Sequence, residues 1–135
     1  MTALRAIRTV LESHLSTTSP ALPAIAWPNV PYTPATGTPY IQVEFIPVLR
    51  RPVVVGPAPE QRHSGLFYLT VLTPESRGAD AGLDLVDRLL TRFNGHTSII
   101  GATVNVSIEY SEAKMALHSP PFYAIPVEIG WYAYV

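Results

Sequence analysis

The side chains able to carry chemistry are few in this sequence, and their spacing matches no familiar catalytic or metal-binding motif. The four histidines, His14, His63, His96 and His118, share no interval typical of metal ligands. His14 falls on the apolar stripe of a predicted helix, where a packed and hydrogen-bonded histidine is the favoured interpretation. Because the sequence contains no cysteine, disulfides, thiolate metal sites and thiol nucleophiles are excluded.

The acidic residues give no sign of catalysis either. Most of them belong to the charge pattern of predicted helices, and Glu44 and Glu128 stand alone within predicted strands, at positions that we interpret as solvated or interfacial. Phosphate-binding loops, dinucleotide-binding glycine patterns, nucleophile elbows and His-Glu-x-x-His zinc motifs do not occur. We therefore expect a protein that is not an enzyme, with no catalytic residues, no metal and no cofactor.

The local concentration of basic charge consists of Arg50 and Arg51, together with Arg62. One interpretation is a solvated pair at the exit of a strand. The other is an arm whose guanidinium groups meet acidic surface or backbone carbonyls of a partner. An apolar run, Val53, Val54 and Val55, lies between these arginines and favours an arm that is buried against another subunit.

Composition indicates a single domain over residues 1–135 that hides part of its surface. Nine basic and ten acidic residues give a net charge of −1, which argues against general nucleic-acid binding. No apolar run approaches the roughly 20 residues of a membrane helix, and no signal peptide is expected. Charged residues make up 14% of the chain, against about 25% in ordinary soluble domains. So little surface charge favours burial in an assembly.

Apolar periodicity predicts two helices and several strands. The helices are expected over about 3–15 and 78–93; in the second, Leu83 falls on the predicted buried stripe, whereas Leu85 lies off it and is a candidate subunit contact. Strands are expected at 40–46, 64–72, 96–100, 103–110 and 123–134, after a short apolar piece at 24–27. Pro126 implies an edge position or a bulge in the last strand.

The order of these elements predicts an α+β fold. We expect a mainly antiparallel or mixed β-sheet with two α-helices packed on one face and a long arm between two strands. That arm or loop spans residues 47–63, far more than the two to five residues of a tight hairpin connection.

Several spaced signals resemble the tail terminator (tail completion) family of long-tailed bacteriophages. They begin with the Leu4–Arg8 helix and Trp27-Pro28-Asn29, and continue with Tyr32-Thr33-Pro34 through Gly37-Thr38-Pro39-Tyr40. The later ones are Gly65-Leu66-Phe67-Tyr68, a Pro74 to Gly78 approach to a helix, and Pro126-Val127-Glu128-Ile129 before an aromatic end. The resemblance covers nearly the whole chain.

The resemblance implies a structural virion protein, made in the bacterial host cytoplasm and located at the neck end of the tail. Such proteins form a ring, typically of six subunits, that caps the tail tube, stops its polymerisation and offers a joining surface to the head connector. The implied partners are further copies of the chain, the tail-tube protein, the head–tail connector or stopper and the tape-measure protein, while DNA passes through the lumen without specific binding.

Two other classes of protein stay open at this point. Another neck or tail-tube protein of the same virion would share the composition and would also assemble as rings, but a tube protein would polymerise by itself. A monomeric ligand-binding module with aromatic residues around a pocket would show no assembly.

Overall fold

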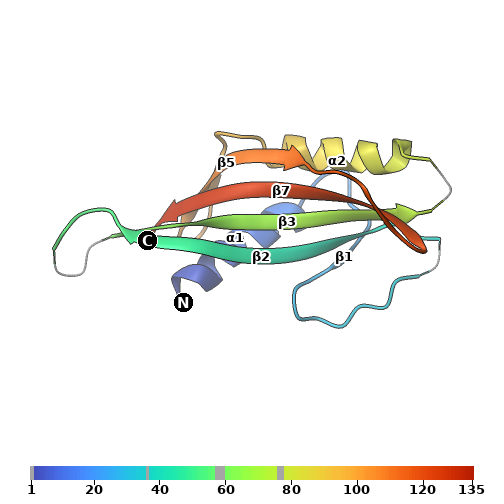
Figure 1. Cartoon of the computed structure of the whole chain (residues 1–135). Coiled ribbons are helices and arrows are strands. Elements are labelled where there is room, and N and C mark those ends of the chain that lie inside the picture. Colours follow the sequence, from blue (N-terminus) through green and yellow to red (C-terminus); the bar gives the residue numbers. More distant parts are fainter. Residues whose placement is uncertain (1, 36, 57–59, 76–77) are drawn as a thin grey trace.

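The computed structural model describes residues 2–35, 37–56, 60–75 and 78–135, and within them the chain forms two helices and seven strands (Figure 1). In chain order these are α1 (Ala3–Ser16), β1 (Ala24–Ala26), β2 (Tyr40–Pro52), β3 (Gln61–Pro74), α2 (Asp80–Arg92), β4 (Ser98–Ile100), β5 (Asn105–Ala113), β6 (Leu117–Ser119) and β7 (Phe122–Tyr134). The strands form one mixed sheet in the order β1-β2-β3-β7-β5-β4, with β6 paired to β7. Only the β1–β2 pairing is parallel. The predicted α+β class is confirmed.

The centre of the sheet is the antiparallel ladder between β3 and β7. Its register runs without interruption from Arg62 opposite Tyr134 to Pro74 opposite Phe122. Side chains alternate between the two faces of a strand, so odd-numbered residues of both strands share one face. That inner face is almost wholly apolar, and both helices pack against it.

One continuous core joins the helices to the inner face of the sheet. Its fully buried members include Phe67, Leu69, Val127, Ile129 and Trp131 from the sheet, and Ile7, Leu11, Leu15, Leu89 and Phe93 from the helices. The prediction that Trp131 belongs to the core is confirmed. The packed interpretation of His14 is confirmed as well, because His14 Nε2 donates to the Arg92 carbonyl at 2.9 Å and its ring meets Phe93 edge-on.

Two strands are longer than the sequence pattern indicates. β2 continues six residues beyond the expected end at Ile46, and β3 begins three residues before the expected start at Ser64. Alternation of apolar and polar residues stops in these extensions, but the backbone pairing continues after a register shift between Pro47 and Leu49. Most of the predicted arm, 47–63, is therefore the end of a paired hairpin, and residues 57–59 lie outside the described residues.

Pro126 occupies a central strand, not an edge, and the structure explains how. In a strand, the N–H and C=O of one residue point to the same side. The Pro126 carbonyl accepts from Lys114 N, on the side where the pairing of β5 ends at Val127 and that of β6 has stopped at Ala124. The side on which Pro126 lacks an N–H therefore lies between the ends of β5 and β6, where no paired strand requires a backbone donor.

The sheet leaves no room for a side chain at Gly65. A Cβ there would collide with the Ile46 carbonyl oxygen and come within 2.9 Å of the buried Trp131 ring. We expect Gly65→Ala to lower the free energy of unfolding by about 1–3 kcal/mol. Ser64→Ala, its neighbour on the other face, should stay within about 0.5 kcal/mol of the parent. Denaturant unfolding measures both, and equal effects would contradict this account of the glycine.

Candidate assembly surfaces

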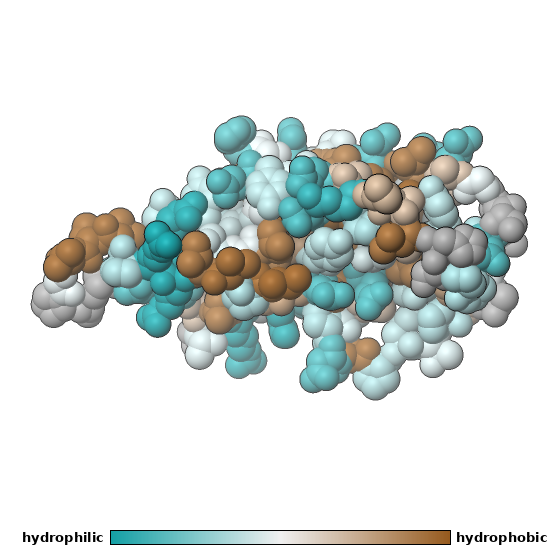
Figure 2. All heavy atoms as spheres, in the orientation of Figure 1, coloured by the Kyte–Doolittle hydropathy of each residue, from teal (hydrophilic) through white to brown (hydrophobic). Residues whose placement is uncertain are grey.

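The predicted interface valines lie at the end of a projecting hairpin. β3 stays paired with the last residues of β7 up to Gln61, so the part of the hairpin that projects beyond the sheet is the loop after Pro52, where Val53 donates from its backbone N–H to the Glu60 carbonyl at 2.8 Å (Figure 1). Val53, Val54 and Val55, called the valine segment below, are all exposed, and Val55 fully so at 104%. Figure 2 shows apolar surface at this outermost end and a hydrophilic band at its base.

The arginines at the base of the hairpin fall on opposite faces. Arg50 pairs with His63, and Arg51 pairs with Arg62. Arg62 lies over the ring of Tyr132, with its guanidinium carbon 4.7 Å from the ring centroid, a cation–π contact that sequence reasoning missed because it joins different strands. The outer face of the hairpin base is thus basic and aromatic.

His63 lies on the inner side of this base and is 4% exposed. Burial lowers the pKa of the His63 imidazole, and the positive charge of Arg50 lowers this pKa further. The histidine therefore remains neutral at pH values where an exposed histidine is already partly protonated.

Leu85 lies apart from the hairpin. It belongs to α2, is half-buried and packs against the core. The exposed leucine of this helix is Leu83, at 48%, which the sequence pattern placed in the buried stripe. The prediction for Leu83 was wrong because the buried face of α2 is centred on Gly82, Val86 and Leu89. The helix is thus rotated about its axis relative to the predicted stripe, and its backbone approaches the sheet at Gly82, which has no side chain.

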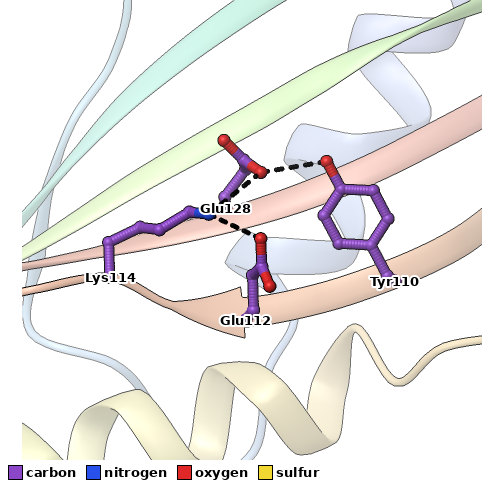
Figure 3. Close-up of polar contacts among 4 residues, drawn as sticks. All are labelled: Tyr110, Glu112, Lys114 and Glu128. Atoms are coloured by element: carbon purple, nitrogen blue, oxygen red, sulfur yellow. Dashed lines mark hydrogen bonds and ion pairs between the residues drawn. The ribbon is translucent and has the colours of Figure 1, made fainter.

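The outer face of the sheet, opposite the core, carries a polar cluster (Figure 3). The Tyr110 hydroxyl donates to Glu128 at 2.9 Å, and Lys114 Nζ lies 2.6 Å from Glu112 and 3.6 Å from Glu128. The hydrogen bond from Lys114 holds the pKa of the Glu112 carboxyl below its usual value. Burial, reinforced by the bond to Glu128, raises the pKa of the Tyr110 phenol. The ring of Tyr110 covers Gly130, where a side chain would displace it.

This cluster belongs to a row that crosses four strands. Glu44 lies opposite Tyr68, Tyr68 opposite Glu128, and Glu128 opposite Glu112. Glu44 and Glu128 look isolated in the sequence, because only the register of the strands places them on one line. The outer face is therefore acidic at mid-sheet and basic at the hairpin base.

A groove of about 700 Å³ lies along the free edge of β2, and we call it the edge groove. β1 pairs with β2 only as far as Gln42, after which the chain turns away at Trp27 and Pro28. Residues 42–46 of β2 form one wall and residues 26–34 the other. The lining combines the apolar and aromatic side chains of Trp27, Val30, Tyr32 and Phe45 with polar surface, and the sequence alone did not predict it.

Within the described residues, no three histidine or carboxylate side chains gather closely enough to hold a metal ion. In that same part of the chain, neither helix has the length and apolar character needed to cross a membrane.

The molecule is thus an α+β domain in which helices cover one face of the sheet, an apolar loop projects at one end and a groove lies open along the edge of β2. The chain belongs to the phage tail terminator family: the family pattern described as phage tail terminator protein matches residues 6–131 of 135. It is thus a structural component of a bacteriophage tail, and the resemblance noted in the sequence is confirmed.

Solved structures agree with this fold. One that carries no descriptive name aligns with 98% of this chain and 96% of its own, with a TM-score of 0.73 and 18% sequence identity. At that identity, the likeness concerns the fold alone. No curated protein matches the chain significantly.

The effect of the Arg50 charge on His63 can be tested by titrating the histidine. Arg50→Gln should raise the pKa of His63, because it removes a positive charge beside the imidazole, whereas Arg51→Gln on the opposite face should leave this pKa unchanged. NMR titration of the ring protons reports both values. Because the pKa of His63 is lower in the folded than in the unfolded protein, the free energy of unfolding decreases as pH falls from about 6.5 through the folded-state pKa. Arg50→Gln should make this decrease smaller. Equal shifts in the two variants would contradict the assignment.

Proposed function

We propose that this protein forms a ring, of six subunits by resemblance to its family, that caps the tail tube of a long-tailed phage. The ring stops tube polymerisation and presents the joining surface for the head connector or stopper at the neck end of the virion. Its subunits are made in the host cytoplasm. The observation that carries the proposal is the valine segment, three neighbouring apolar side chains exposed at the end of a hairpin that extends away from the core.

An exposed apolar segment of this kind is suited to contact with another chain. A small protein with 14% charged residues gains little solubility from exposing three adjacent valines. Covering them in a head-to-tail contact accounts for both features, because each subunit then hides two different lateral surfaces. Heterologous contacts that close on themselves give a ring of limited size, whereas contacts that do not close give a fibre.

Termination requires the two axial faces of the ring to differ. In this proposal one axial face reproduces the stacking surface of the tube subunits and binds the last tube ring. The other face does not reproduce it, so no further tube ring adds, and the head connector binds there instead. The tape-measure protein, which sets the length of the tube, and the DNA that passes through the lumen complete the environment of the ring.

The direct test combines mass measurement with microscopy. Light scattering across a concentration series, with and without purified tail tubes, should give a monomer or a single discrete ring and never an open polymer. Electron microscopy of the mixture should show a cap at one end of each tube. Open-ended filaments of this protein alone would identify a tube subunit instead, and a monomer that ignores tubes at every concentration would overturn the proposal.

A shortened hairpin provides the matched variant. Pro52 and Gln61 are paired, so replacing residues 53–60 with Asn-Gly should close β2 and β3 by a two-residue turn and leave the core intact. We expect this variant to remain folded by circular dichroism and to lose ring formation and tube capping. Normal capping by the shortened protein would exclude the hairpin from the assembly contact.

A further inference from the structure

We propose that the valine segment of one copy docks in the edge groove of the next copy. This inference rests on the proposed function, in which copies of the chain contact each other around a ring, and it names the two surfaces that meet. The occupant of the groove is thus a second copy of this chain.

The shape of the groove suits an extended apolar segment. The β2 wall includes Val43 to Ile46, a stretch that has no strand partner on that side among the described residues. An extended segment laid there can take up the unpaired N–H and C=O groups, as in strand addition to a free sheet edge. Valine favours extended backbone, and the lining of Trp27, Tyr32 and Phe45 offers apolar surface to its side chains.

The valine segment cannot reach the groove of its own chain. The groove borders the first half of β2, next to β1, whereas the valine segment follows the last residue of β2, at the opposite end of the molecule (Figure 1). Six residues lie between Ile46 and Val53, so in an extended strand the two are roughly 23 Å apart. Each copy therefore carries one projecting segment and one groove that its own segment cannot fill, so a contact between two copies through these surfaces is head-to-tail.

The charges of the two surfaces are complementary. Arg51, two residues before the valine segment, has no acidic partner within 4 Å among the described residues, and Glu44 in the groove has no basic one. Both side chains belong to the outer face of the sheet: Glu44 pairs with Tyr68, and Arg51 pairs with Arg62. A segment added edge to edge continues the faces of the sheet it joins, so Arg51 of one copy approaches Glu44 of the next.

Engineered cysteines test the contact directly, because the natural chain contains none. Val54→Cys places a thiol in the valine segment and Val30→Cys places one in the groove, and both positions are exposed in the isolated chain, at 61% and 56%. In protein assembled on tail tubes, mild oxidation of the double variant should give a ladder of cross-linked multimers on a non-reducing gel. Each single variant should give no ladder.

Val54→Cys combined with Met115→Cys is the matched control, since Met115 is 85% exposed and does not line the groove. A ladder with Val30→Cys and none with Met115→Cys supports the proposal. Rings or caps that are visible by microscopy and yet do not cross-link would overturn it while leaving the capping function intact. Cross-linked dimers from Val54→Cys alone, or a cross-linked product that contains tube protein, would also overturn it. Absence of caps in the parent protein would instead count against the proposed function.

A charge exchange tests the same contact without cysteines. Arg51→Glu and Glu44→Arg should each raise the concentration needed for assembly by about 2- to 5-fold, the range of exposed ion pairs. The double variant should return to within about twofold of the parent. Arg5→Glu, on the exposed face of α1, serves as the control for a general change in charge and should leave assembly unchanged. Additive effects in the double variant would exclude the pairing of Arg51 with Glu44.

Discussion

The fold depends on the burial of Trp131, which lies opposite Gly65 in the half of the β3–β7 ladder nearer the hairpin. Its indole lies fully inside the core and stacks on Phe45 at a centroid distance of 5.3 Å, and Gly65 opposite it supplies the space that this requires. Three strands are thereby fixed in register by one packing arrangement. From this level β2, β3 and β7 stay paired as far as Pro52, Gln61 and Val135, and the loop after Pro52 projects beyond them. The position of the valine segment therefore follows from packing in the interior.

The helix side of the molecule is held together by a second arrangement near the ends of α1 and α2. His14 donates to the carbonyl of Arg92, and Arg92 Nε donates to the carbonyl of His14 at 3.0 Å. The two helices are thus joined through backbone carbonyls that a helix end leaves without partners. On the other side of the molecule, β2 is distinguished by its length, its partly free edge and the exposed valine segment that follows it.

Much of this architecture could be predicted from the sequence, for reasons that particular residues make clear. Both helices and the four longer strands, β2, β3, β5 and β7, carry a strong apolar period, so their existence and type were predicted correctly. The extensions of β2 and β3 could not be foreseen, because residues 47–52 pair through the backbone without alternating side chains. β6 was missed for a related reason, being a short strand that adds to β7 where β5 ends. The row from Glu44 to Glu112 and the edge groove arise only from register and from the path of the chain after β1. Such features have no local signature.

The prolines of β2 have a consequence for the protein before it meets its partners. A free sheet edge recruits any extended chain, and a protein produced in quantity risks runaway association and fibrous precipitates. Pro47 and Pro52 interrupt the series of backbone donors along β2, and the register shift after Pro47 bends the edge out of line. The length of edge able to pair is thereby confined to a few residues beside the groove. Newly made copies are protected from indiscriminate aggregation by the same strand that is available for an ordered contact.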